Sequence, residues 1–96
     1  MRAIWIDAKS KTVSEVQVHT LEDWHRYVGC GYVEIAQRLS TGDALLVDEE
    51  GLLRKRDERF YFGGKLYVGN GLIVGRGDDD EAEVSVEVVR DLVVFP

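Results

Sequence analysis

The residues best suited to binding a ligand lie in a basic and aromatic segment in the second half of the chain, here called the basic strip. Its members are Arg54, Arg56, Arg59, Tyr61 and Lys65. Guanidinium groups form paired hydrogen bonds with phosphate, and aromatic rings stack on bases or on the rings of a partner. The strip therefore predicts a site for a small phosphorylated ligand. The alternative is that its aromatic residues belong to the core and its basic residues to a solvated loop.

Two acidic clusters offer a second candidate surface, suited to a basic protein partner. They comprise Asp48, Glu49 and Glu50, and then Asp78, Asp79 and Asp80. The formal net charge of −6 disfavours general nucleic-acid binding, because counterion release requires a positive face. The second cluster does not match a calcium loop, which places oxygen ligands at alternate positions around a glycine. A solvated turn is the simpler interpretation of that cluster.

Three residues of types that ligate zinc, His19, His25 and Cys30, lie close together in the sequence. Their spacing matches no zinc pattern, and a second cysteine is missing. Cys30 also follows the end of a predicted helix, whose carbonyl groups disfavour a thiolate. No Ser-His-Asp or Cys-His arrangement follows from the spacing. We therefore expect no catalytic residue, no bound metal and no cofactor, and a protein that is not an enzyme.

A glycine-rich stretch covers Gly69-Asn70-Gly71 and Gly75-Arg76-Gly77, a composition that occurs in phosphate loops. No Lys-Ser or Lys-Thr pair follows the last glycine, so the stretch is not a P-loop. No long helix follows it either, which excludes a dinucleotide-binding fingerprint. The glycines of this stretch are therefore expected to form turns.

One amphipathic helix is expected to organise the remaining elements. Its apolar face repeats at spacings i, i+3, i+4 and i+7 through Leu21, Trp24, His25 and Val28. Thr20 begins the helix and forms a capping box with Asp23, and Gly29 ends it, giving a helix over about 20–29. A helix of this length is not stable alone, so Trp24 is expected to pack on a sheet.

Short alternating runs predict strands over 3–7, 13–19, 31–36, 44–48, 60–62 and 72–74. In the first run, Ile4 and Ile6 point to one face, and Ala3 and Trp5 to the other. Because both faces are apolar, this run is expected to be a central strand. The chain is therefore predicted to be one α+β domain over residues 1–96, with a mostly antiparallel, curved sheet of about five to seven short strands covered by the helix.

Two segments allow alternative structures. Asn70-Gly71 favours a hairpin between 66–68 and 72–74, and the alternative is an irregular lead into a single strand at 72–74. Residues 84–95 form either a short helix over 86–92, capped by Ser85, or a strand. The β-branched residues of that segment favour the strand.

No apolar run approaches the roughly 18–20 residues that span a bilayer, and the first residues are too short an apolar run for a signal peptide. The single cysteine excludes an intrachain disulfide. These features predict a cytoplasmic protein that does not enter membranes.

Several segments resemble a family of short proteins of unknown function encoded by bacteriophages and mobile elements. The segments are 1–7, 31–35, 47–52 and 69–75, with Val13 and Val16 between the first two. The chain departs from the resemblance at 54–59 and at 84–95. The resemblance implies an α+β fold and a phage or plasmid context, and it assigns no functional residue. Small acidic phage proteins often bind a host factor such as a defence system, an association by context.

These observations favour a small non-enzymatic protein that inhibits or sequesters a host factor, through its acidic surface or through the basic strip. One alternative is a metal-dependent hydrolase or transferase that uses carboxylates of the acidic clusters. Another is a structural or assembly subunit, with a homodimer joined through an unpaired edge strand near the tail.

Overall fold

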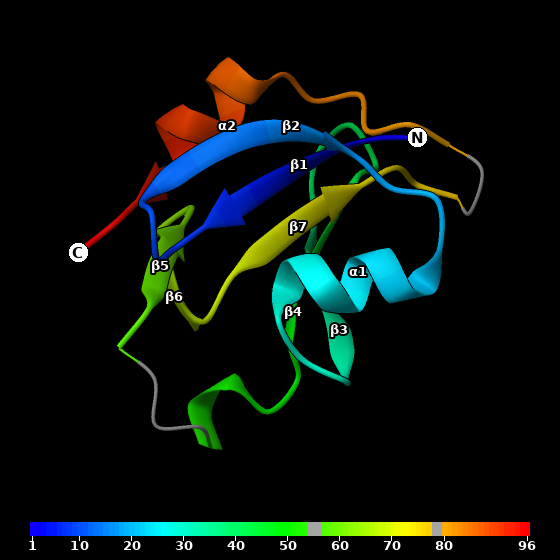
Figure 1. Ribbon diagram of the computed structural model, residues 1–96. Helices are drawn as coiled ribbons and strands as arrows, with labels where there is room; N and C mark the ends of the chain where they lie inside the picture. Colours follow the sequence, from blue (N-terminus) through cyan, green and yellow to red (C-terminus); the bar gives the residue numbers. More distant parts are fainter. Residues whose placement is uncertain (54–56, 78–79) are drawn as a thin grey trace.

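The computed structural model describes residues 1–53, 57–77 and 80–96, and Figure 1 shows their arrangement. The strands are β1 (Arg2–Asp7), β2 (Thr12–Gln17), β3 (Val33–Arg38), β4 (Ala44–Asp48), β5 (Arg59–Phe62), β6 (Lys65–Val68), β7 (Gly71–Val74) and β8 (Val93–Val94). The helices are α1 (Leu21–Val28) and α2 (Val86–Leu92), with a short 3-10 turn at Gly51–Leu53. The α+β class, the main helix and the short C-terminal helix agree with the expectation from the sequence.

The described strands form two antiparallel sheets. The larger sheet has the order β2-β1-β7-β4-β3, and the smaller has the order β6-β5-β8. The described residues thus hold eight strands in two sheets, where the sequence predicted about five to seven in one curved sheet. The additional sheet arises because β5 pairs with β6 on one side and with the tail strand β8 on the other, and neither β5 nor β6 pairs with β7.

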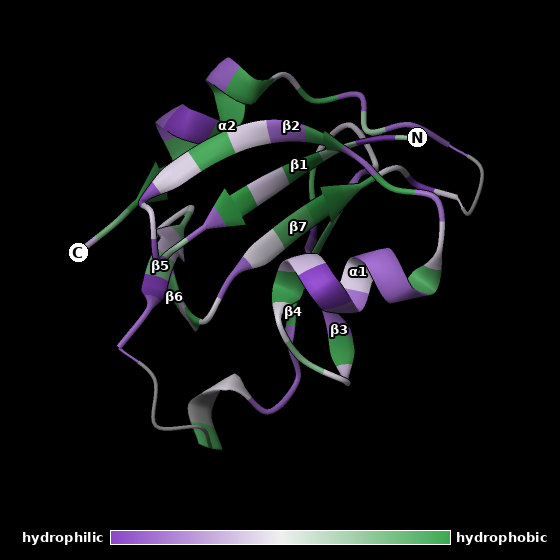
Figure 2. Ribbon diagram, in the orientation of Figure 1, coloured by the Kyte–Doolittle hydropathy of each residue, from purple (hydrophilic) through white to green (hydrophobic). Residues whose placement is uncertain are grey.

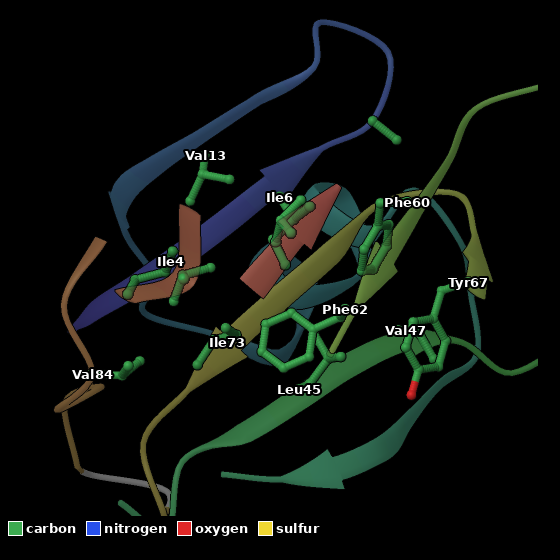
Figure 3. Close-up of a cluster of buried hydrophobic side chains, with 13 residues drawn as sticks. Ile4, Ile6, Val13, Leu45, Val47, Phe60, Phe62, Tyr67, Ile73 and Val84 are labelled. Carbon is green, nitrogen blue, oxygen red and sulfur yellow. The ribbon is translucent and has the colours of Figure 1, made fainter. Parts of the chain in front are cut away.

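A core on each face of the larger sheet explains why β1 is apolar on both sides. Ile4 and Ile6 belong to the first core, between the two sheets, and Figure 3 shows them in the cluster that also contains the rings of Phe60, Phe62 and Tyr67. Ala3 lies in the second core, beneath α1, with Trp5 packed against it. Figure 2 shows the apolar character of β1 and β7 at the centre of the larger sheet.

The helix α1 has the ends that the sequence predicts. The Thr20 side chain accepts from the amide of Asp23, the Asp23 carboxylate accepts from the amide of Thr20, and Gly29 ends the helix with φ of 83°. Trp24 is half-buried against the second core. Its expected packing on the sheet is therefore confirmed.

The acid stability of this helix start is expected to depend on Asp23. The amides of His19 and Thr20 donate to its carboxylate at 2.7 and 3.1 Å, and the His19 amide above all holds the pKa of Asp23 below its ordinary value of 3.8. A lowered pKa in the folded chain gives stability that is present above pH 3.8 and is lost as the pH falls through the lowered pKa.

Urea unfolding of the wild type and Asp23→Asn at several pH values tests this prediction. The free energies of unfolding of the two proteins are expected to differ at neutral pH and to converge as the pH falls below the ordinary carboxyl pKa. Glu22→Gln is the control, because Glu22 is exposed in the same helical turn. A gap between wild type and Asp23→Asn that stays constant at every pH would contradict the assignment.

Of the two alternatives for residues 66–74, the hairpin is wrong, and the strand expected at 72–74 is present as β7. β6 pairs with β5 across Gly63-Gly64, and β7 lies between β1 and β4 in the other sheet. Asn70 lies in the connection between the two sheets, where its side chain accepts from the amide of Ala8 at 2.9 Å and donates to the carbonyl of Tyr27 at 3.3 Å. These long-range hydrogen bonds engage the side chain of Asn70, which would otherwise form part of a tight turn.

Of the two alternatives for the tail, the helix over 86–92 is confirmed, and the strand that the β-branched residues favour is absent over those residues. Ser85 caps α2 by accepting from the amide of Val88, and the chain becomes extended only at β8. Val89 is fully buried in the first core, so packing of the helix outweighs the preference of valine for strands. Within the described residues, no helix has the length and apolarity needed to cross a membrane.

Candidate functional site

The described part of the basic strip is divided between two faces of the smaller sheet. Arg59 and Tyr61 lie on the exposed face of β5, whose alternate residues are buried. Lys65 pairs with Phe62 on the opposite face, and its Nζ lies 5.6 Å from the ring centre of Tyr67. Arg54 and Arg56 lie outside the described residues. The expectation that Arg59, Tyr61 and Lys65 line one site is therefore corrected.

The Lys65 side chain belongs to a small hollow of about 190 Å³ with mixed charge. Carboxylate residues of the same lining include Glu34, Asp48 and Glu49. Asp48 is only 4% exposed, and its Oδ1 accepts from the amide of Glu50 at 2.9 Å. Asp48 therefore holds the turn after β4 and contributes to the wall of the hollow more than to the exposed acidic surface.

The two acidic clusters do not form one surface. Glu49 and Glu50 are exposed directly after the carboxyl end of β4. Asp80 is exposed and lies near the other end of β4. Its backbone packs against Gly75, which follows β7, and the end of β7 pairs with the start of β4. Asp78 and Asp79 lie outside the described residues. The acidic face expected from the sequence is thus two separate patches.

The zinc-type residues are also separate in the described structure. His19 is exposed, and His25 and Cys30 are half-buried. The Cys30 Sγ lies 3.2 Å from the carbonyl oxygen of Tyr32, to which it donates. In the part of the chain that the structure describes, no three His, Cys, Asp or Glu side chains come close enough to hold a metal.

Sequence reasoning missed a groove of about 590 Å³ between α2 and the turn that joins β3 to β4, here called the α2 groove. Its apolar lining includes Leu39, Phe62, Val84, Val88 and Leu92. Val88 and Leu92 are 48% and 38% exposed. Val88 and Leu92 are four residues apart, so they lie on the same face of α2, next to the buried Val89. The helix therefore carries a second apolar row that is not buried. This second row was the available signal, and it becomes visible only when the segment is treated as a helix.

The charged residues at the α2 groove lie in its lining and on the adjoining helix α2. Glu83 contributes to the lining, and Glu87 and Asp91 are exposed on α2. Among the described lining residues the one cation is Arg38, on the opposite wall. Arg90 is directed to β2, where its Nη2 donates to the carbonyl of Val13 at 3.2 Å. The groove therefore combines an apolar floor with one carboxylate and one cation in its described lining, and α2 carries two further exposed carboxylates outside that lining.

The buried carboxylate of Asp43 joins the two walls of the groove. This residue is 1% exposed at the end of the β3–β4 turn. It accepts from the amides of Glu83 and Val84, the latter at 2.8 Å, and from the Thr41 hydroxyl at 2.8 Å. The segment that leads into α2 is thereby fixed to the turn opposite it.

The chain was compared with curated proteins, solved structures and protein families. Neither a curated protein nor a solved structure matches the chain. A family described as a domain of unknown function, DUF3846, matches residues 1–93. Because the match covers nearly the whole sequence, the chain belongs to the DUF3846 family.

Proposed function

We propose that this chain is a non-enzymatic binding protein and that its partner is a protein that inserts an apolar segment with basic flanks into the α2 groove. The observation that carries the proposal is the exposed pair Val88 and Leu92, which lines a groove beside the exposed carboxylates Glu87 and Asp91 of the same helix. Exposed apolar surface with a polar rim commonly marks an interaction site, and central apolar contacts supply most of the binding energy.

The charges around the groove support a basic partner over an acidic one. Glu83, Glu87 and Asp91 attract Lys or Arg residues that flank an apolar segment, and such attraction speeds association and selects partners more than it adds affinity. Binding is therefore expected to weaken moderately with salt, while the apolar contact persists.

A phage or mobile-element origin, which the sequence resemblance implies, gives this proposal a biological context. In that context the partner is a host protein, and occupation of the groove inhibits or sequesters it, as an anti-defence protein does. A second copy of this chain is the competing occupant, and it would give a homodimer.

Substitution of the groove tests the proposal. Leu92→Lys places a cation in the groove. The carboxyl end of α2 tolerates this cation because of the helix dipole, but the cation repels a basic partner. Capture of the partner from host-cell lysate is expected to fall about tenfold or more with this variant. Leu53→Lys is the matched control, because Leu53 is 83% exposed and is not part of the groove lining. Glu87→Lys is expected to weaken capture less, and mainly at low salt.

The outcomes distinguish the possible occupants. A captured protein whose cross-linked segment is apolar with basic flanks supports the proposal. Equal capture by the wild type and Leu92→Lys would refute it, as would an acidic segment in the groove. Self-association that Leu92→Lys abolishes, measured by light scattering, would replace the protein partner with a second copy.

A further inference from the structure

We propose that Arg38 and Arg76 form a site for a phosphate monoester that carries a planar apolar group. The Arg38 Nη1 donates to the carbonyl of Gly42 at 3.2 Å, and the Arg76 Nη2 donates to the carbonyl of Thr41 at 3.0 Å. The two guanidinium groups are thus anchored on consecutive carbonyls of one turn. Both residues are exposed.

Neither arginine at this turn forms an ion pair with a described carboxylate, although the buried Asp43 follows in the same turn and the Asp80 carboxylate lies beside Gly77. Among the described residues, the ion pairs within 4.0 Å are Arg2 with Glu15 and Arg26 with Asp23, and they include neither Arg38 nor Arg76. Two neighbouring cations repel each other, and a doubly charged anion between them removes that repulsion. Arginine suits such an anion, because its planar group forms paired hydrogen bonds with phosphate oxygens.

Gly42 leaves the space that the Arg76 side chain occupies. Its φ of +95° lies in the left-handed region, and a Cβ added there would lie 2.6 Å from the Arg76 Nη2. An alanine at this position would be strained and would displace the guanidinium group. The turn is therefore shaped to hold Arg76 where it lies.

A hollow of about 110 Å³ adjoins the two arginines, between α1, β3 and the end of β7, elements that can be followed in Figure 1. Its lining includes Trp24, Ile35, Leu46 and Val74 together with the arginines, and among the described lining residues there is no carboxylate. Trp24 is half-buried and Ile35 is 51% exposed. The two arginines supply hydrogen-bond donors and positive charge for the phosphate, and the side chains of Trp24 and Ile35 supply an apolar wall against which a ring can pack.

This site differs from the basic strip expected from the sequence, and it is independent of the protein partner proposed for the α2 groove. Arg38 is the one residue that lines both the hollow and the groove. Failure of phosphate binding would leave the proposal for the groove intact, since Arg76 is not part of the groove lining.

Calorimetric titration with phenyl phosphate and with inorganic phosphate tests the inference. We expect saturable binding of both probes, with phenyl phosphate bound more tightly because its ring contacts Trp24. Arg38→Gln and Arg76→Gln are each expected to weaken binding about tenfold, the effect of losing one charge-assisted contact. Arg90→Gln is the matched control, since Arg90 is an exposed arginine directed to β2.

Arg76→Lys separates charge from geometry, because it keeps the cation but removes the planar group. We expect it to recover only part of the affinity that Arg76→Gln loses. Circular dichroism of each variant verifies that it is folded. The inference is overturned if neither probe binds the folded wild type saturably, or if Arg90→Gln loses as much affinity as Arg76→Gln.

Discussion

Replacement of Asp43 by alanine is expected to lower the free energy of unfolding by about 4 kcal/mol, because hydrogen bonds to a charged group contribute about 1.5–3 kcal/mol each and the buried donors lose their acceptor. The donors are the Thr41 hydroxyl and the amides of Glu83 and Val84. Because Asp43 is 1% exposed, water does not replace the carboxylate without opening the structure.

Urea unfolding followed by circular dichroism measures this loss. Asp43→Asn is expected to lose less unfolding free energy, because it keeps one acceptor oxygen. Its amide NH2 group would nevertheless lie against donors, with which it cannot form hydrogen bonds. The control is Asp91→Ala, an exposed position on α2, for which a change within about 0.5 kcal/mol is expected. A loss below about 1 kcal/mol for Asp43→Ala would mean that the carboxylate does not carry the contact between the two walls.

Phe60→Ala is expected to destabilise the chain by about 4 kcal/mol, the usual cost of removing a buried aromatic side chain. Phe60 is fully buried between the two sheets, and its ring centre lies 5.5 Å from that of Tyr67. It also reaches the larger sheet, because a Cβ on Gly71 would lie 2.8 Å from its Cζ. The ring therefore joins the smaller sheet to β7, as Figure 3 shows for its position in the first core.

Thermal and urea unfolding of Phe60→Ala and Phe60→Leu measure this contribution. We expect the leucine variant to lose clearly less, because it fills part of the cavity. Tyr61→Ala provides the comparison on the exposed face of the same strand, where Tyr61 is 37% exposed. An equal loss for Phe60→Ala and Tyr61→Ala would contradict the assignment of the inner face of β5.

The elements with strong local determinants could be predicted from the sequence. The helix over 20–29 combines an apolar spacing, a capping box and a terminal glycine; the two caps are present in the structure, and of the apolar face Val28 is buried whereas Leu21 is 58% exposed. The two apolar faces of the first strand predict a central position, and β1 lies between β2 and β7 with a core on each side. In these segments local preference and tertiary packing agree, so a single sequence is sufficient.

The remaining features depend on which strands pair, and this is not encoded locally. Asn70-Gly71 has the composition of a hairpin turn, but β6 pairs with β5 and leaves β7 to the larger sheet. The same pairing places Lys65 on the face opposite Arg59, which divides the basic strip. The α2 groove draws residues from three distant segments and from a helix whose valines favour a strand. The candidate site therefore becomes visible only with the tertiary structure.

Site-specific photo-crosslinking tests most directly whether the chain acts through the α2 groove. A photoreactive phenylalanine analogue in place of Val88, which is 48% exposed in the groove, is compared with the same analogue in place of Leu53. The account predicts that the Val88 position cross-links one partner protein through an apolar segment with basic flanks, and that the Leu53 position does not. Cross-links to that partner from position 53 and none from position 88 would contradict it.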